Sequence, residues 1–198
     1  MMDIVIVCVL SYLIGSLPNG LILGKSIWGI DLREHGSHNI GATNAWRTIG
    51  KVAGFSVFLL DLLKGIAGVW FGMKFGSTAL APVLGGIFAI VGHSCSIFLK
   101  FKGGKGVATG LGVIAMLMPL PTIIVFAVWF IIVKITGYVS LGSIVAAALV
   151  PVLAWIFGKS VEVIGFGVLA AAFIIIRHKE NIGRLLSGKE SKIKAAKH

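Results

Sequence analysis

The chain has 198 residues, of which 57% are hydrophobic and 13% are charged, and its mean hydropathy is +1.01. Soluble domains carry about 25% charged residues, so this composition excludes a soluble protein and predicts one membrane-embedded domain over residues 1–198. The net charge of +11 does not indicate nucleic acid as a partner, because basic residues also accumulate on cytoplasmic loops beside anionic lipid headgroups.

Two apolar segments open the chain. Residues 4–24 are long enough to cross a bilayer, and Pro18 predicts a kink in their second half. Residues 52–73 form the next predicted span, which carries Asp61 and Lys64 three positions apart on one helical face. Charges at this depth usually face the bundle interior and pair, so we predict an ion pair, with a proton or ion pathway as the alternative.

A polar, glycine-broken segment lies between these two spans. We call residues 36–47, Gly-Ser-His-Asn-Ile-Gly-Ala-Thr-Asn-Ala-Trp-Arg, the polar island. It must face water or line a cavity, because each unpaired polar group in lipid costs several kcal/mol. Its glycines let backbone N–H groups turn toward an anion, and its arginine suits phosphate. We predict an anion site here, the alternative being a hydrophilic connection between spans; the candidate side chains are Ser37, Asn39, Thr43, Asn44 and Arg47.

The third predicted span, residues 78–99, contains His93, which has no second ligand at helical spacing and is predicted to be structural. The glycine–lysine loop follows, a name used here for residues 101–106, Phe-Lys-Gly-Gly-Lys-Gly. Its glycines let the backbone approach a ligand, and a helix predicted to begin there would attract phosphate. The spacing of nucleotide-binding loops is absent, so we predict phosphate rather than ATP, with a basic topological turn as the alternative. The candidate contacts are Gly103, Gly104, Lys105 and Gly106.

Residues 106–133 allow two interpretations, one long helix or two short segments folded back at Pro119 to Pro121. Folding back places nearly all loop lysines and arginines on one side of the membrane, whereas one long helix divides them about evenly. Basic residues concentrate on the cytoplasmic side, so the folded-back pair is favoured. Spans at 141–157 and 161–176 complete an all-α protein of seven transmembrane helices, with its N-terminus outside and its C-terminus in the cytoplasm.

The C-terminal segment carries further polar candidates and is predicted to end in a basic, mobile cytoplasmic tail over residues 187–198. His178 and Asn181 share a face if the last helix continues through them. The histidine is a candidate general base or a hydrogen-bond donor to phosphate, and the asparagine is a candidate for orienting the substrate. Ser143, near the start of the sixth segment, is a candidate helix cap or phosphate ligand.

The predicted topology brings the polar island, the glycine–lysine loop, the turn at 137–143 and residues 177–186 to one cytoplasmic face. These motifs contain no nucleotide fingerprint, no metal-ligand cluster and no G-x-S-x-G elbow. Glu180 is their only carboxylate, so neither a Mg²⁺ site nor a cofactor is expected.

The motifs resemble those of the bacterial, membrane-integral glycerol-3-phosphate acyltransferases that use acyl phosphate. The resemblance is carried by residues 36–44 with Arg47, by residues 101–109 and by residues 177–182, and it covers nearly the whole chain in order. It implies seven helices around a cytoplasm-facing site in the bacterial inner membrane. It also implies that the 1-hydroxyl of sn-glycerol 3-phosphate attacks a long-chain acyl phosphate, giving lysophosphatidic acid and inorganic phosphate in the first acylation of phospholipid synthesis.

The resemblance implies that His178, Asn181 and Ser37 belong to the catalytic group. It also implies that the glycine–lysine loop binds glycerol phosphate. Acyl phosphate is already activated, so direct transfer is expected. His178 either takes the hydroxyl proton or orients the glycerol while a substrate phosphate oxygen takes it. Ser37 has no evident activating base in its motif, so we favour it as a hydrogen-bond donor to phosphate rather than as a nucleophile. Position 38, often glycine in such proteins, is His38 here.

The expected partners are the two substrates, membrane lipid and an enzyme that supplies the acyl phosphate. A different class of protein also fits the basic, glycine-rich loops at a membrane face. This alternative is a carrier or channel for a small phosphorylated anion, with Asp61 and Lys64 on its pathway. It predicts flux in liposomes without acyl transfer.

Overall fold

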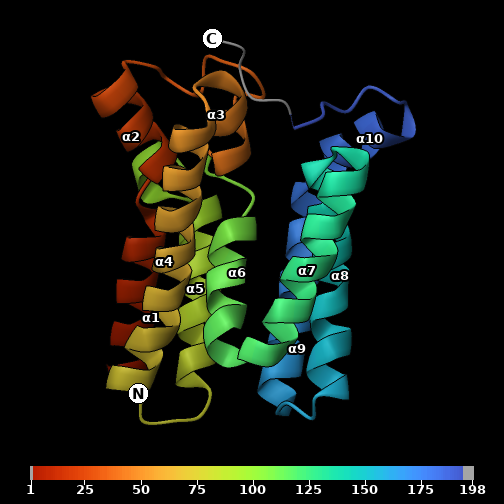
Figure 1. Ribbon diagram of the computed structural model, residues 1–198. Helices are drawn as coiled ribbons and strands as arrows, with labels where there is room; N and C mark the ends of the chain where they lie inside the picture. Colours follow the sequence, from red (N-terminus) through yellow and green to blue (C-terminus); the bar gives the residue numbers. More distant parts are fainter. Residues whose placement is uncertain (1, 194–198) are drawn as a thin grey trace. The chain divides into compact units, whose positions relative to one another are not determined.

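The computed structural model describes residues 2–193, and within that range every regular element is a helix (Figure 1). The chain divides into an N-terminal unit up to Val113 and a C-terminal unit from Ile114 to Ile193, which we describe separately. The N-terminal unit contains α1 (Met2–Ser16), α2 (Asn19–Trp28), α3 (Ala42–Thr48), α4 (Lys51–Phe75), α5 (Ala81–Ser94), the short 3₁₀ helix η1 (Ile97–Leu99) and the start of α6 (Val107–Leu117).

Helices α1, α4 and α5 pack against one another through small residues. Gly68 of α4 faces Gly85 of α5 so closely that a Cβ on either would overlap the other backbone. Gly15 of α1 lies in the same way on the backbone of Ala89. Helices in lipid associate through van der Waals contact rather than a hydrophobic driving force, so close backbone approach stabilises this core.

The kink predicted near Pro18 is confirmed. Helix α1 ends at Ser16 and α2 begins at Asn19, because proline has no N–H to continue the helix and restricts the residue before it. The Nζ atom of Lys64 donates to the carbonyl oxygen of Leu17 at this break over 2.9 Å. The predicted ion pair is also confirmed, with Nζ of Lys64 3.0 Å from Oδ1 of Asp61.

The C-terminal unit contains α7 (Pro119–Thr136), α8 (Val139–Ile156), α9 (Val161–Arg177) and α10 (Lys179–Leu186). Helix α8 packs against both α7 and α9. Gly137, with a φ of 78°, makes the tight turn from α7 into α8. Helix α10 bends 60° away from α9, so the condition under which His178 and Asn181 would share one face of a continuous helix is not met.

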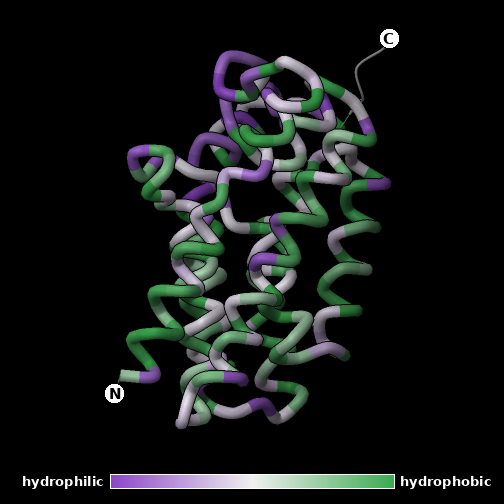
Figure 2. The backbone as a smooth tube through the Cα atoms, turned by 90° about the vertical axis from the view of Figure 1, so that its left-hand side faces the viewer, coloured by the Kyte–Doolittle hydropathy of each residue, from purple (hydrophilic) through white to green (hydrophobic). Residues whose placement is uncertain are grey.

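Among the described residues, five helices or joined helices are long and apolar enough to cross a membrane, or six if α9 and α10 form one broken span. Helix α6 is a shorter apolar helix. The predicted interruption before residues 119–121 is confirmed, because α6 ends at Leu117 and α7 begins at Pro119. Figure 2 shows hydrophobic residues along the helices and hydrophilic stretches at the loops and helix ends. This distribution matches an integral membrane protein.

Candidate functional site

Asn44 is the buried residue that holds the polar island together, and it is only 2% exposed. Its Oδ1 atom accepts a hydrogen bond from the backbone N–H of Ser37 over 3.0 Å. Its Nδ2 group donates to the carbonyl oxygens of Leu32, His35 and Asn39 over 2.8 to 3.0 Å. These bonds give Asn44 a supporting role in the loop, and its direct contact with substrate stays a prediction.

The end of the polar island forms α3, a helix that the sequence analysis did not predict. Asn39 fixes the turn before this helix, because its Oδ1 accepts a hydrogen bond from the N–H of Gly41 over 2.9 Å. Thr43 and Arg47 are four residues apart on α3, so they share one helical face. Both are partly buried, whereas Ser37 is exposed. The helix therefore gives two of the predicted anion contacts a common direction.

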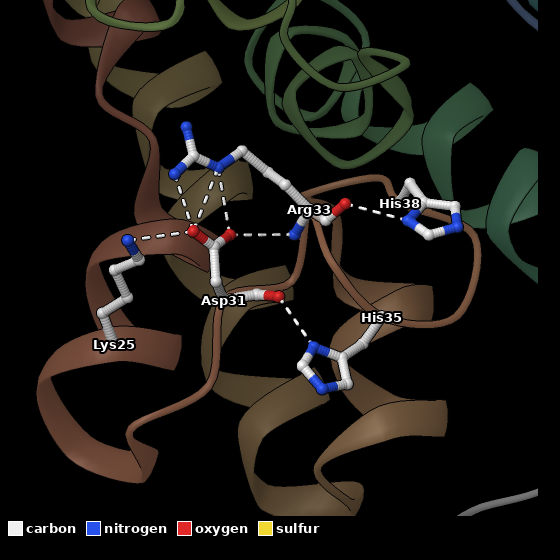
Figure 3. A network of polar contacts seen from close by, with 5 residues as sticks. All are labelled: Lys25, Asp31, Arg33, His35 and His38. Atoms are coloured by element: carbon white, nitrogen blue, oxygen red, sulfur yellow. Dashed lines mark hydrogen bonds and ion pairs between the residues drawn. The ribbon is translucent and has the colours of Figure 1, made fainter.

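The loop that leads into the polar island is held by Asp31 (Figure 3). Its carboxylate lies 2.6 Å from Nη2 of Arg33 and 2.9 Å from Nζ of Lys25. The hydrogen bonds from Arg33, and then that from Lys25, hold the pKa of Asp31 well below its usual range, although burial opposes them. The carboxylate therefore stays ionised and fixes the loop to α2.

Two histidines close the same loop through their rings (Figure 3). Nδ1 of His35 lies 2.9 Å from the carbonyl oxygen of Asp31, and Nδ1 of His38 lies 2.9 Å from that of Arg33. His38 has a φ of 55°, in the left-handed region that favours glycine. This positive φ explains why glycine suits position 38. The hydrogen bond between the His38 ring and the carbonyl oxygen of Arg33 offsets part of the backbone strain.

Replacing Asn44 with alanine is expected to destabilise the protein by about 1–3 kcal/mol, because buried carbonyl groups lose their donor. Activity should also fall, since the backbone of Ser37 loses its acceptor. Thermal unfolding and acyl transfer measure the two effects. Thr48→Val is the matched control, because its hydroxyl reaches Oδ1 of Asn44 only at 3.4 Å. Equal effects of the two changes would contradict a central role for Asn44.

The glycine–lysine loop folds back onto the end of α5. The N–H of Gly103 donates to the carbonyl oxygen of Ser94 over 3.0 Å, and that of Gly104 donates to the carbonyl oxygen of His93 over 3.1 Å. These two N–H groups are therefore already bonded to the end of α5, and phosphate contact by the two glycines stays a prediction. Gly106, with a φ of 82°, directly precedes α6, so the predicted helix start is confirmed.

His178 lies at the junction of α9 and α10 and is 3% exposed. Its Nδ1 atom is 2.7 Å from the carbonyl oxygen of Ile174. A carbonyl oxygen only accepts, so Nδ1 carries the hydrogen, and in the neutral ring the lone pair is on Nε2. This tautomer suits a ring whose Nε2 accepts a proton.

Glu190 is a buried polar residue that the sequence analysis missed. Its Oε1 accepts from Oγ of Ser140 and from Nδ2 of Asn181, each over 2.8 Å. Its Oε2 accepts from Nε of Arg184 over 2.7 Å. Burial raises the pKa of Glu190, but the hydrogen bonds from Asn181, Arg184 and Ser140 outweigh it and leave the pKa below 4.5. The carboxylate therefore stays ionised and holds Asn181 in place.

The mobile tail predicted over residues 187–198 stays a prediction, although contacts join Glu190 and Ile193 to the rest of the C-terminal unit. The side chain of Glu190 is 3% exposed, and the N–H of Ile193 donates to the carbonyl oxygen of Gly137 over 2.7 Å. The rest of the predicted tail, residues 194–198, lies outside the described residues. The available sequence signal was Glu190 itself, a single acid between Lys189 and Lys192.

Ser143 is 3% exposed and lies inside α8. Its hydroxyl donates to the carbonyl oxygen of Val139 over 2.8 Å and accepts from Nε1 of Trp129 over 3.3 Å. The predicted cap role is wrong, because α8 begins at Val139 and Tyr138 occupies the cap position. Contact between Ser143 and phosphate stays a prediction.

No group of three or more His, Cys, Asp and Glu side chains within residues 2–193 could hold a metal ion. The residues predicted to contact an anion are hydrogen-bond donors and cations. The N-terminal unit carries Arg47 and Lys105 in the predicted anion motifs. The C-terminal unit carries His178 and Asn181, oriented by a backbone carbonyl and by Glu190.

Comparisons with known proteins agree with this chemistry. The sequence model of the family described as glycerol-3-phosphate acyltransferase matches residues 5–188. The chain is 44% identical over 186 residues to a glycerol-3-phosphate acyltransferase of Fusobacterium nucleatum, covering 94% of this chain and 96% of the relative. It is 46% identical over 185 residues to that of Trichlorobacter lovleyi, covering 93% and 95%.

Two crystal structures of PlsY, an integral membrane glycerol 3-phosphate acyltransferase, are also similar. The glycerol 3-phosphate form has a TM-score of 0.91 and 38% identity, covering 96% of each chain. The lysophosphatidic acid form has a TM-score of 0.88 and 37% identity, covering 96% of this chain and 94% of the other. With its motifs, its apolar helices and these relatives, the chain belongs to the glycerol-3-phosphate acyltransferase family.

Proposed function

We propose that this chain transfers a fatty acyl group from acyl phosphate to the 1-hydroxyl of sn-glycerol 3-phosphate, releasing inorganic phosphate and lysophosphatidic acid. Acyl transfer to glycerol 3-phosphate is the activity of the family to which the chain belongs. One observation carries the proposal: similar crystal structures are described as a glycerol 3-phosphate form and a lysophosphatidic acid form, which are the acceptor and the product of this reaction.

The reaction is a direct transfer. The 1-hydroxyl oxygen bonds to the acyl carbonyl carbon, and the bond between that carbon and the phosphate oxygen breaks. The hydroxyl proton passes to Nε2 of His178, which the bond from Nδ1 to Ile174 supports as the acceptor nitrogen. A phosphate oxygen of the substrate is the alternative proton acceptor. Ser37 donates a hydrogen bond to phosphate and forms no acyl-serine; trapping an acyl group there would contradict direct transfer.

Two phosphorylated substrates repel each other, so fixed donors and cations must offset their charges. Arg47 and Lys105 supply the cations in the N-terminal unit. The predicted hydrogen-bond donors to phosphate are Ser37, Asn39, Thr43 and Gly106. Four further predicted contacts, Asn44, Gly103, Gly104 and Ser143, already donate within the protein and would support this set. Asn181, held by Glu190 over 2.8 Å, orients the acceptor beside His178. The proposed acyltransferase domain spans residues 1–198 and requires no cofactor.

The first test is purified protein in lipid with glycerol 3-phosphate and acyl phosphate. We expect equal amounts of lysophosphatidic acid and inorganic phosphate, unchanged when Mg²⁺ is added or chelated. Acyl transfer that needs acyl-CoA instead would contradict the proposed donor. Anion flux into liposomes without any transfer would contradict the enzymatic function and favour a carrier. In the cell, the donor must come from a reaction that forms acyl phosphate.

The proposed topology has seven spans in the bacterial inner membrane, with the N-terminus outside and the C-terminus in the cytoplasm. It counts α1 with α2 as one span, α9 as another and α6 as a short one; the basic loops support this sidedness. Single cysteines at Lys102 and Lys159, in a chain lacking Cys8 and Cys95, test it with a membrane-impermeant thiol reagent. We expect labelling from outside only at position 159. Labelling from outside at position 102 would overturn the topology.

Lys105→Met is expected to raise the KM for glycerol 3-phosphate about 10- to 100-fold, because one charge-assisted contact to phosphate contributes about 1.5–3 kcal/mol. Lys102→Met, in the same loop and with the same loss of charge, is the matched control and should change that KM less than about twofold. Initial rates at saturating acyl phosphate measure both. Similar effects of the two changes would indicate a general loop charge rather than a phosphate contact.

A further inference from the structure

A buried polar network lies in the N-terminal unit behind the glycine–lysine loop. Oδ1 of Asp61 is 3.0 Å from Nζ of Lys64, 3.1 Å from Nδ2 of Asn19 and 3.8 Å from Nδ1 of His93. Asp61, Lys64 and His93 are each no more than 4% exposed. The proposed reaction does not use any of these ionisable groups.

The ring of His93 packs directly on the glycine–lysine loop. A Cβ on Gly104 would overlap Nε2 of His93, and a Cβ on Gly103 would overlap its carbonyl oxygen. The same carbonyl oxygen accepts the N–H of Gly104 over 3.1 Å. His93 therefore occupies the space that a side chain at position 104 would need, one residue before Lys105.

Such a network is poorly explained by stability alone. Burying charges costs free energy, and replacing a buried ion pair with apolar residues is often neutral or stabilising. Charged groups inside membrane helices are expensive and usually functional. In this chain Asp61 lies near one ring nitrogen of His93, and the other ring nitrogen lies against the loop.

We propose that Asp61, Lys64 and His93 are positioning residues that set the backbone of Gly103, Gly104 and Lys105 for binding glycerol phosphate. The inference rests on the proposed function of that loop. Asp61, neutralised by Lys64, orients the imidazole. The imidazole then fixes how closely the backbone of Gly104 approaches α5, and with it the position of the Lys105 ammonium group. Gly104 is glycine because His93 fills its Cβ position.

The first experiment couples His93 to Gly104 in the full-length protein. Gly104→Ala alone is expected to raise the KM for glycerol 3-phosphate on the order of tenfold, because the new methyl group displaces the loop. In a His93→Ala background the ring is absent, so adding Gly104→Ala should change that KM less than about twofold. Equal fold-changes in the two backgrounds would overturn the inference.

The second experiment removes both charges together with Asp61→Asn and Lys64→Met. We expect the KM for glycerol 3-phosphate to rise about tenfold, the KM for acyl phosphate to stay within about twofold and the melting temperature to stay near that of the wild type. Ser11→Ala is the control, because Ser11 is buried in the same unit outside the network and its hydroxyl bonds the carbonyl oxygen of Gly68. A folded double variant with both KM values unchanged would mean that the pair is structural only.

His93→Gln guards against loss of folding, because its amide keeps a polar group beside Asp61 and fills part of the space of the ring. It should retain a KM within about threefold of the wild type, whereas His93→Ala should not. Equal KM values for these two variants would contradict positioning by the ring. The wild-type assay separates this inference from the proposed function. Absence of acyl transfer in the wild type defeats the function, whereas transfer with insensitive variants defeats only the positioning role.

Discussion

Replacing Glu190 with alanine is expected to lower acyl transfer by about 100-fold, because Asn181 loses the carboxylate that orients it and a displaced group near the reacting atoms costs on this order. The buried donors of Ser140 and Asn181 would lose their acceptor, at about 1–3 kcal/mol each. Arg184 would lose its ion-pair partner as well. Acyl-transfer rates and thermal unfolding of the purified variant measure the two effects.

Glu190→Gln separates charge from shape. It keeps the size of the side chain but presents an amide N–H₂ group where one carboxylate oxygen accepts a hydrogen bond, so an intermediate loss of activity and stability is expected. Lys189→Ala, the neighbouring exposed change, should have little effect on either. Wild-type activity in both Glu190 variants would show that Asn181 does not depend on this carboxylate.

The stabilising effect of Glu190 should also depend on pH. Its pKa in the folded protein is below 4.5, its ordinary value, so the unfolded chain takes up the proton first as the pH falls. The contribution of this group is therefore complete above pH 4.5 and is lost as the pH falls through the folded-state pKa. The difference in melting temperature between wild type and Glu190→Gln should be constant from pH 7 to about 5 and shrink at lower pH. A constant difference at all pH values would contradict this account.

Replacing His178 with alanine is expected to lower kcat by about 10²- to 10⁴-fold, the range that a general base contributes. The rate should also lose the part of its pH dependence that reflects deprotonation of this imidazole. Rates measured from pH 5 to 9 at saturating substrates test both points, with the exposed His35→Gln as the control. Loss of rate with an unchanged pH profile would assign the proton to a substrate phosphate oxygen and leave His178 an orienting role.

Much of the fold follows from local properties of the chain. Apolar length predicted the spans, Pro18 and Pro119 predicted the breaks, and the three-residue spacing of Asp61 and Lys64 predicted their ion pair. These features depend on residues close in sequence, which helical periodicity and proline geometry govern. The motifs likewise predicted the family, because they occur in the expected order along nearly the whole chain.

The supports of the candidate site come from contacts between distant residues. Glu190 bonds Ser140, fifty positions earlier, and His93 reaches back to Asp61 on another helix. Sequence spacing does not encode which helix faces meet, so the sequence analysis did not identify Glu190 in the basic C-terminal segment. Likewise, Ser143 was predicted to be either a helix cap or a phosphate ligand, and only its position inside α8 excludes the cap.

The sequence by itself therefore determined the membrane class, the breaks between helices and the family, and it located the motifs proposed to bind anions. Only the tertiary structure decided which polar atoms are free to serve a ligand and which are used to hold others in place, as with Asn44 and Glu190. The physical reason is that burial and hydrogen-bond geometry arise only when the helices pack, whereas composition and periodicity act along the chain alone.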